Sequence, residues 1–250
     1  MIYEDIRDGT AVVTGASQGI GRATSIGLLN QKAKVMGIDL NEATIEHENY
    51  THYCCDLQST GEIKKVFNSI KAQVESIDYL VNVAGIDPKI SIEKGDEKYW
   101  DKIVNLNLRG YYFCIRSSLD MLKKGNGKSI VNLSSINYRL GVPGRSIYSS
   151  TKAGIIGLTA GLARELGKEG IRINCISPGW IFTERQNKEY FDTGDEEKNK
   201  RHFEDLFSKQ SLKVKIHPED IANHVLFFLS DSSRATTGHN LVVDGGWLLE

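Results

Sequence analysis

The sequence predicts one α/β domain built on a doubly wound parallel sheet of seven strands. Short β-branched runs alternate with longer helical patterns, most of these runs are apolar without alternation, and a glycine-rich turn follows the first of them. Alternating strands and helices are typical of successive βαβ units, and continuously apolar strands are expected where helices cover both faces of a sheet. The expected strands are 10–13, 34–38, 50–55, 79–83, 129–133, 171–176 and 241–243.

Two long helices are expected between these strands. Apolar residues step by three and four from Trp100 to Leu122 and stop before a glycine, which marks one face of a helix. A second stripe runs from Tyr148 through Lys152 to Leu166. Because its apolar members must face the core, Tyr148 and Lys152 are expected on the buried side as well. An unpaired buried lysine is costly, so packing alone explains it poorly.

Residues 1–250 are interpreted as one domain with an irregular segment near its end. No repeat, low-complexity tract or linker divides the chain. From about residue 180 to 218 the alternation stops, and charged residues crowd positions 192–201. A connection of this length in a compact domain is functional or mobile. We expect either a lid over a substrate pocket or a solvated excursion with a short helix.

Composition excludes several classes of partner. The 31 basic and 32 acidic residues leave a formal charge of −1, which supplies no field for holding nucleic acid or an anionic membrane. No apolar stretch is long enough to span a membrane and no secretory segment begins the sequence, so we expect a cytoplasmic protein. The four cysteines lack disulfide or metal-site spacing, and no bound metal is expected.

The loop after the first strand suits a nucleotide. It carries three glycines and precedes a helical pattern. Glycines let a pyrophosphate approach the backbone and the helix offers free N–H groups, although glycines also form turns that bind nothing. The glycines are Gly15, Gly19 and Gly21.

The second strand ends at Asp39, about 20 residues beyond the loop, where a carboxylate can accept hydrogen bonds from the adenosine ribose hydroxyls. A 2′-phosphate would meet like charge there, and the loop carries Gln18 rather than a basic residue. The cofactor is therefore expected to be NAD rather than NADP. The alternative is a strand-end aspartate that caps the next segment.

Six motifs, in this order and spacing, resemble those of the short-chain dehydrogenases/reductases, which have a Rossmann-type sheet. The resemblance extends over residues 9–246. One departure is Val83, where the family usually has a second asparagine, and it puts a sheet-stabilising contact in doubt. The motifs are the loop from Thr14 to Gly21, Asn82-Val83-Ala84-Gly85, Asn107, Ser135, the pair Tyr148 and Lys152, and Pro178-Gly179.

The resemblance implies a catalytic set of four residues. Tyr148 would be the general acid/base, and Ser135 would polarise the substrate oxygen. Lys152 would bind the nicotinamide ribose and support Tyr148. Asn107 would hold a water in a proton relay, and its alternative is a polar side chain bonded to nearby backbone.

The chemistry also requires a lysine beside the tyrosine. The pKa of a tyrosine is near 10, and base catalysis near neutrality needs it lowered by about three units, or roughly 4 kcal/mol. A cation about 4 Å away contributes about 4 kcal/mol at an effective dielectric near 20. Lys152 is thus expected to be sufficient, and the positive ring of NAD⁺ would add to it.

The same resemblance implies the remaining cofactor contacts. Asp56 and Leu57 would bracket the adenine, with a helix N-cap as the alternative for Asp56. The segments after the fourth and sixth strands would meet the ribose, the carboxamide and a phosphate. The full expected set is Gly15, Ser17, Gln18, Gly19, Ile20, Gly21, Asp39, Asp56, Leu57, Asn82, Ala84, Gly85, Tyr148, Lys152, Ile181 and Thr183.

The substrate wall is expected from segments 87–92, 136–145 and 180–191. These segments offer donors and acceptors for hydroxyls and a flat platform at Trp180, whereas a sterol or acyl chain would need a more apolar wall. The alternative to substrate binding for Arg139, Arg145 and Arg185 is solvation at the surface or contact with another subunit. The expected substrate contacts are Ser135, Asn137, Arg139, Arg145, Tyr148, Trp180, Glu184, Arg185 and Gln186.

Segments 134–141 and 178–186 are similar to those of bacterial NAD-dependent aldose 1-dehydrogenases of this family. This resemblance implies oxidation of the anomeric hydroxyl of a sugar to a lactone. The alternatives are reduction of a 3-oxoacyl thioester or of a ketose in a polyol/ketose pair, and a nucleotide-sensing scaffold without turnover. The family also implies a homotetramer built through 242–249 and through the helices that carry Tyr111, Tyr112, Phe113, Ile115, Ile156 and Leu158.

Overall fold

A computed structural model describes residues 2–249 and contains the expected parallel sheet. The order is β3-β2-β1-β4-β5-β6-β7, and every neighbouring pair is parallel. The seven predicted strands are confirmed, with ends that differ by at most two residues. The strands are β1 Thr10–Thr14, β2 Lys34–Asp39, β3 Tyr50–Cys54, β4 Tyr79–Asn82, β5 Ser129–Leu133, β6 Arg172–Pro178 and β7 Asn240–Val243.

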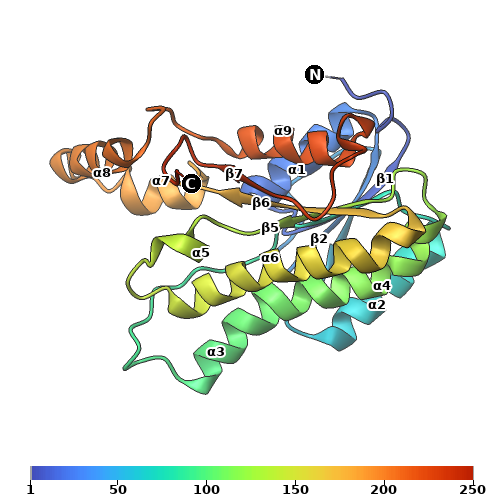
Figure 1. Cartoon of the computed structure of the whole chain (residues 1–250), viewed down its shortest axis with the longest axis horizontal. Helices are drawn as coiled ribbons and strands as arrows, with labels where there is room; N and C mark the ends of the chain where they lie inside the picture. The colour runs from blue at the N-terminus through green and yellow to red at the C-terminus, as the bar shows by residue number, and fades with distance from the viewer. Residues whose placement is uncertain (1, 250) are drawn as a thin grey trace.

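Helices cover both faces of the sheet, as the apolar strands require. Figure 1 shows α1 and α9 on one face and α2, α4 and α6 on the other. The helices are α1 Gly19–Asn30, α2 Thr60–Gln73, α3 Glu97–Val104, α4 Gly110–Lys124, α5 Asn137–Leu140, α6 Ser146–Leu166, α7 Glu184–Tyr190, α8 Glu196–Lys209 and α9 Pro218–Leu229.

Strand β1 lies at the centre of both core layers. Ala11 and Val13 belong to the apolar cluster that includes residues of α1 and α9, whereas Val12 belongs to the cluster on the opposite face. Successive side chains of a strand point to opposite faces, so a strand covered on both sides is apolar at every position. All five residues of β1 are buried.

The long helix predicted from Trp100 to Leu122 is present, but it contains a wider turn. A π-helical stretch, Asn105–Arg109, joins α3 to α4. Such turns are rare and frequently lie at functional sites. The spacing of apolar residues gave no sign of it. Tyr111 and Ile115 of the predicted stripe are buried in the core, whereas Trp100 is half exposed.

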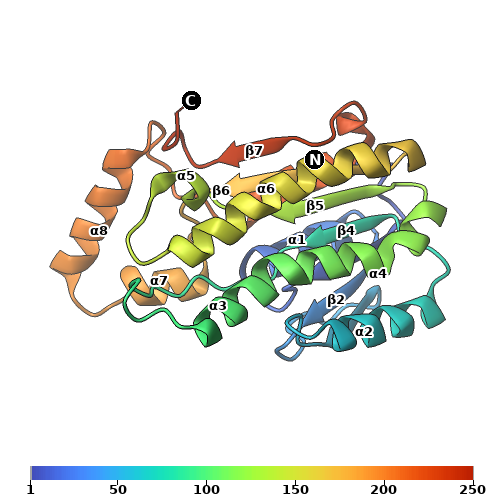
Figure 2. The ribbon, with the colours of Figure 1, turned by 60° about the horizontal axis from the view of Figure 1, so that its bottom comes forward.

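The topology places a ligand site at the carboxyl ends of β1 and β4. From β1 the chain builds β2 and β3 on one side, and then crosses to add β4 to β7 on the other. Ligands of doubly wound sheets bind outside the carboxyl ends of the strands at this reversal. In Figure 2, α7 and α8 lie beyond the same end of the sheet, to which the arrowheads of β5 and β7 point.

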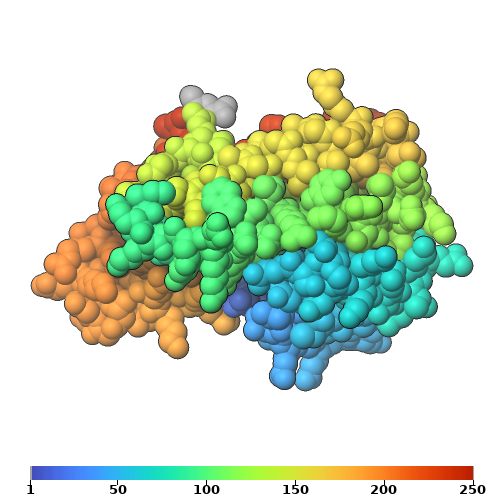
Figure 3. All heavy atoms as spheres, turned by 90° about the horizontal axis from the view of Figure 1, so that it is seen from below, coloured from blue at the N-terminus to red at the C-terminus, as the bar shows by residue number. Residues whose placement is uncertain are grey.

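The segment from 180 to 218 is a packed substructure rather than a solvated excursion with one short helix. Its two helices, α7 and α8, enclose an aromatic cluster. The ring centroids of Phe191 and Phe203 are 4.1 Å apart, and those of Phe182 and Phe191 are 5.0 Å apart. In Figure 3 this orange segment and the green segment around α3 meet the blue N-terminal part at a hollow.

Candidate active site

A cavity of about 700 Å³ runs along the carboxyl ends of the strands and brings most of the expected site residues together. It reaches from the glycine loop and Asp39 at one end to Trp180 and Arg185 at the other. The expected cofactor residues that line it are Gly15, Gln18, Gly19, Ile20, Asp39, Asp56, Leu57, Ala84, Gly85, Tyr148, Lys152, Ile181 and Thr183.

The glycine loop needs its glycines for backbone reasons. Gly15 and Gly19 have φ of +68° and +52°, which side chains other than glycine rarely adopt. A Cβ on Gly21 would lie 2.0 Å from the carbonyl oxygen of Gly15, so this glycine lets α1 pack against the loop. Gln18, the residue before α1, makes no side-chain cap. The first N–H groups of the helix therefore keep their capacity to bind an anion.

Asp39 is held rigidly at the end of β2. Its Oδ2 accepts a hydrogen bond from the Ser17 N–H over 3.1 Å, and its Oδ1 accepts one from the Asn41 N–H over 2.9 Å. Among the described residues between 15 and 58 that line the cavity, none is lysine or arginine. The glycine cradle and this carboxylate fit the phosphates and the ribose of a dinucleotide.

Three expected cofactor residues lie behind the cavity wall instead of lining it. Ser17 is buried, and its Oγ donates to the Glu42 carbonyl oxygen. Gly21 is buried against the loop, as described above. Asn82 is fully buried, and its amide donates to Asn132 Oδ1 over 2.9 Å, which ties β4 to β5. Their contribution to this site is to hold the wall in place.

Two further expectations are settled by hydrogen bonds. The N-cap of α2 is Ser59, so the alternative of an N-cap at Asp56 is wrong. The contact put in doubt by Val83 is made by backbone, because the N–H of Val83 donates to Thr14 Oγ1 over 3.0 Å. Strands β1 and β4 are therefore joined without a second asparagine.

Ser135, Tyr148 and Lys152 meet at the middle of the cavity. Ser135 follows β5, and Tyr148 and Lys152 are one turn apart in α6. Nζ of Lys152 donates to the Leu133 carbonyl oxygen over 2.8 Å and lies 5.7 Å from the centroid of the Tyr148 ring. Two of the predicted catalytic residues thus come from one buried face of a helix, as the spacing indicated.

Burial dominates the titration of this pair. It raises the pKa of Tyr148 to about 12, although a hydrogen bond with Ser135 and the charge of Arg145 lower it in part. It lowers the pKa of Lys152 to about 8. Burial thus opposes the charged form of both groups. That Lys152 brings the pKa of Tyr148 towards neutrality stays a prediction.

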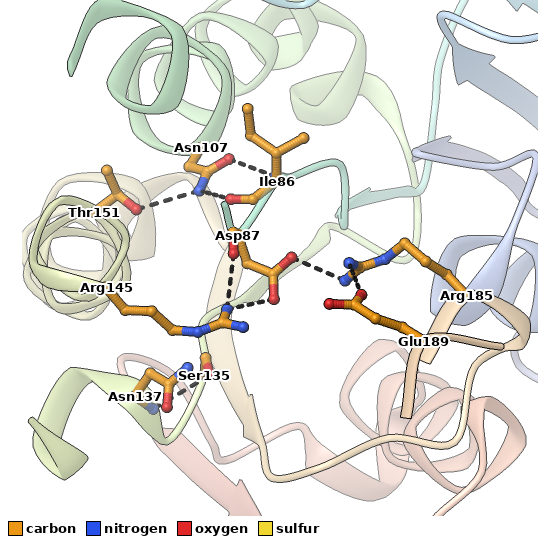
Figure 4. Close-up of polar contacts among 9 residues, drawn as sticks. All are labelled: Ile86, Asp87, Asn107, Ser135, Asn137, Arg145, Thr151, Arg185 and Glu189. Atoms are coloured by element: carbon orange, nitrogen blue, oxygen red, sulfur yellow. Dashed lines mark hydrogen bonds and ion pairs between the residues drawn. The ribbon is translucent and has the colours of Figure 1, made fainter. Parts of the chain in front are cut away.

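Asn107 lies in the π-helical stretch and does not line the cavity. Its Oδ1 accepts from the Ile86 N–H over 2.9 Å, and its Nδ2 donates to the Ile86 carbonyl oxygen over 2.8 Å and to Thr151 Oγ1 over 3.4 Å. Figure 4 shows this reciprocal pairing. The side chain of Asn107 thus fixes nearby backbone, here the loop after β4. A part in a proton relay stays a prediction.

All but one of the expected substrate contacts line the cavity, Ser135 and Tyr148 at its middle and the others towards its far end; Arg139, in α5, does not line it. Two buried atoms there, Nε1 of Trp180 and Oε1 of Gln186, have no hydrogen-bond partner among the described residues. The contacts present are Ser135, Asn137, Arg145, Tyr148, Trp180, Glu184, Arg185 and Gln186.

Sequence reasoning placed Asp87 only at the border of this wall and missed its role. Asp87 forms ion pairs with both Arg145 and Arg185, which are 58 and 98 residues away in the chain. Lys89 and Tyr190 lie in the expected wall segments without having been named, and Trp247, which lines the same cavity, was missed. No short-range motif signals contacts between segments so far apart.

A family model described as "Enoyl-(Acyl carrier protein) reductase" matches residues 15–248. The chain belongs to the short-chain dehydrogenase/reductase family. It is therefore an oxidoreductase of this family, which implies a nicotinamide cofactor.

Three relatives of this dehydrogenase/reductase illustrate the range of the family. The chain is 35% identical to D-xylose 1-dehydrogenase of Caulobacter vibrioides, with 98% of each chain covered. It is 33% identical to a 3-oxoacyl-[acyl-carrier-protein] reductase of Staphylococcus epidermidis, with 95% of this chain and 98% of the other covered. The solved structure of Thermoplasma acidophilum aldohexose dehydrogenase matches with a TM-score of 0.91 at 30% identity, covering 98% of this chain and 96% of the other.

Proposed function

We propose that the protein is an NAD-dependent aldose 1-dehydrogenase, which oxidises the anomeric hydroxyl of a free sugar to a lactone. The observation that carries the proposal is one continuous cavity with Asp39 at one end, Tyr148 and Ser135 in the middle, and a polar wall at the other. The names of the xylose and aldohexose dehydrogenases to which the chain is similar support a sugar.

NAD is favoured over NADP by the charge at the adenosine end. The Asp39 carboxylate would accept the two ribose hydroxyls and repel a 2′-phosphate. No described lysine or arginine among the lining residues 15–58 offsets that charge. The glycine loop would hold the pyrophosphate, and Asp56 with Leu57, Gly85 and Thr183 would line the rest of the nucleotide.

The site would remove a proton and a hydride from the same C1–O1 unit. When bound, the oxidised nicotinamide supplies the hydride acceptor. Ser135 would hold O1 beside Tyr148, and the Tyr148 phenolate would take the O1 proton. Lys152 would bind the nicotinamide ribose hydroxyls through its ammonium group.

The pKa of Tyr148 must fall for this chemistry. Lowering this pKa from about 12 to near 7 corresponds to a free-energy change of roughly 7 kcal/mol. The ammonium group of Lys152, with Nζ 5.7 Å from the ring centroid, would favour the phenolate. The positive charge of the oxidised nicotinamide would supply part of the remainder, which couples deprotonation of Tyr148 to binding of NAD⁺.

The polar lining of the substrate end favours a polyhydroxyl substrate. Asn137, Glu184 and Arg185 line it and offer hydrogen-bond donors and acceptors. Sugar hydroxyls both donate and accept, so they can pair with such groups. Edge contacts with Tyr190 and Phe191, at centroid distances of 4.9 and 6.0 Å, hold the Trp180 ring in the wall.

Reduction of a 3-oxoacyl thioester is the second candidate, favoured by the match to a 3-oxoacyl reductase and by the description of the family model. The same residues would act in reverse, with Tyr148 as the acid. Where NADPH is the reductant, the Asp39 carboxylate argues against this reaction because it would repel the 2′-phosphate of the cofactor. A nucleotide-sensing scaffold is the third candidate, and the intact Ser135, Tyr148 and Lys152 argue against it.

Initial rates with NAD⁺ and NADP⁺ over a panel of aldoses, with polyols beside them, test the proposal. The expected result is reduction of NAD⁺ by at least one aldose and a much lower rate with NADP⁺. No turnover of any aldose, beside NADPH-dependent turnover of acetoacetyl thioester, would overturn it.

A homotetramer and a cytoplasmic location complete the proposal. Tyr111 and Ile115 are buried within the chain and cannot form the interface, whereas Trp100 and Tyr112 are 50% and 44% exposed on α3 and α4. Within 2–249, no helix combines the length and apolar character that crossing a membrane demands. Light scattering that finds a monomer at micromolar concentration would contradict the tetramer, and cell fractionation tests the location.

A further inference from the structure

Asp87 lies at the substrate end of the cavity with both carboxylate oxygens paired to arginines. Nη1 of Arg145 contacts Oδ2 and also donates to the Asp87 backbone carbonyl oxygen over 2.9 Å. Nη2 of Arg185 lies 2.8 Å from Oδ1. Figure 4 shows the Asp87 carboxylate between the two guanidinium groups. One carboxylate thus neutralises cations from two other segments.

The three segments are also held together by backbone. Asp87 follows β4, Arg145 precedes α6 and Arg185 lies in the first turn of α7. The N–H of Ile90 donates to the Gly144 carbonyl oxygen over 2.8 Å, which fixes the loop of Asp87 against the loop of Arg145. Burial lowers the pKa of Arg145, but the hydrogen bond and charge of Asp87 more than offset it, so the net shift is upward.

The other charges around this end are balanced as well. Lys209 pairs with Asp205, Arg185 lies 3.4 Å from the Glu189 carboxylate, and Nζ of Lys89 lies 5.6 Å from the centroid of the Tyr190 ring. Three carboxylates and four cations line this end, and Glu189, which pairs with Arg185 but does not line the cavity, is a fourth carboxylate. The charged groups are Asp87, Glu184, Glu189 and Asp205, and Lys89, Arg145, Arg185 and Lys209.

We propose that Asp87 sets the charge preference of the substrate cavity, so that it takes uncharged polyhydroxyl substrates and rejects those that carry a carboxylate or phosphate. The inference rests on the proposed function, because it specifies which sugars the site accepts. An entering carboxylate would have to displace Asp87 from an arginine and lie beside its charge, which is unfavourable. Asp87 acts through Arg145 and Arg185 and is a specificity-determining positioning residue.

Matched sugars and matched variants test this directly. The kcat/KM of D-glucose and D-galactose would be compared with that of D-glucuronate and D-galacturonate. For the wild-type protein we expect the uronates to be worse by about a hundredfold, since like-charge contacts are strongly disfavoured. Asp87→Asn should shrink this gap at least about tenfold, because Arg145 loses its carboxylate partner and Arg185 keeps only Glu189. Glu189→Gln, which removes the exposed partner of Arg185 and leaves the Arg145 pair intact, should keep the gap.

A binding measurement separates this inference from the proposed function. Malonate would be titrated calorimetrically into NAD⁺-saturated wild-type, Asp87→Asn and Glu189→Gln proteins. Malonate should bind the Asp87→Asn protein at least about tenfold more tightly than the other two. Equal affinity for all three overturns the inference. If no aldose is oxidised the proposed function fails, and the malonate result then decides the inference alone.

The wild-type protein gives a test that does not depend on the folding of a variant. Should it oxidise the uronates as well as the neutral sugars, the inference is wrong. If Asp87→Asn does not fold, as judged by circular dichroism, Asp87→Ser removes the same charge and is held to the same two outcomes.

Discussion

The nucleotide end and the substrate end of the cavity are built in different ways. At the nucleotide end, three glycines and Asp39 lie within 25 residues of one another, and backbone conformation makes most of the surface. At the substrate end, side chains from three distant segments meet around Asp87, with an aromatic cluster behind them. The first end is fixed by local sequence and suits a constant ligand. The second depends on tertiary contacts, and substitutions can retune it without disturbing the sheet.

The largest expected effect lies between the two ends. Tyr148→Phe removes the proton acceptor and should lower kcat by at least about 10³-fold. The affinity for NAD⁺ should change little, since the nucleotide end is untouched. Tyr138→Phe, in α5 and outside the cavity lining, is the matched control and should keep full activity. A Tyr148→Phe protein with a tenth or more of the wild-type rate would contradict the assignment.

At the nucleotide end, Asp39→Asn should weaken the choice of cofactor. Loss of one buried charge beside the ribose should move the ratio of kcat/KM for NAD⁺ and NADP⁺ by about a hundredfold towards NADP⁺. The sugar KM should stay unchanged. Glu42→Gln removes an exposed charge nearby that does not line the cavity, and it should leave the ratio as it was. A ratio that is the same in both variants would mean that Asp39 does not read the ribose.

The pH profile of kcat/KM tests the role of Tyr148, which lies between the two ends of the cavity. Because burial raises the pKa of Tyr148 above its ordinary value of 10, the free protein holds the phenol at neutral pH. Oxidation needs the phenolate, so kcat/KM should rise with pH by about tenfold per unit below the apparent pKa. Reduction needs the phenol, so its kcat/KM should be independent of pH below the apparent pKa and fall above it.

Ser135→Ala is the companion measurement for this profile. The hydrogen bond from Ser135 lowers the pKa of Tyr148, so its loss should move the rising limb to higher pH. A limb that moves to lower pH, or a flat profile in the wild-type protein, would contradict a tyrosine base.

The smallest expected effect belongs to the substrate wall. Trp180→Phe keeps an aromatic ring beside Tyr190 and shortens the flat surface that Trp180 offers to the cavity. The KM for the sugar should rise by up to about tenfold because contact area is lost, while the KM for NAD⁺ stays constant. Tyr190→Phe, in the same cluster, is the control. If the KM for NAD⁺ rises instead, Trp180 contacts the cofactor and its assignment to the substrate end is wrong.

The same comparison explains how far the sequence could predict the molecule. All seven strands, the glycine loop and Asp39 follow from local patterns, because backbone conformation and strand ends are encoded over short distances. Asn82 and Ser17 were expected in the wall but support it from behind, since a motif does not say which way a side chain points. The π-helical turn at Asn107 leaves the apolar spacing almost unchanged.

The substrate end was the less predictable one. Trp180 and Gln186 could be proposed from their place after β6, but the pairing of Asp87 with two arginines could not. Such a pairing depends on side chains from the loop after β4, from the residue before α6 and from α7, which meet only in the folded chain. The pKa values likewise follow from burial, which the positions of Tyr148 and Lys152 in a stripe do not quantify.

Transfer of deuterium tests the central claim most directly. An aldose labelled with deuterium at C1 would be incubated with the protein and NAD⁺, and the reduced cofactor analysed by mass spectrometry. The account predicts that the label is recovered in the reduced nicotinamide, and that the same sugar labelled at C2 transfers none. Label retained in the sugar product, or a reduced cofactor formed only with unlabelled hydrogen, would contradict hydride transfer from the anomeric carbon.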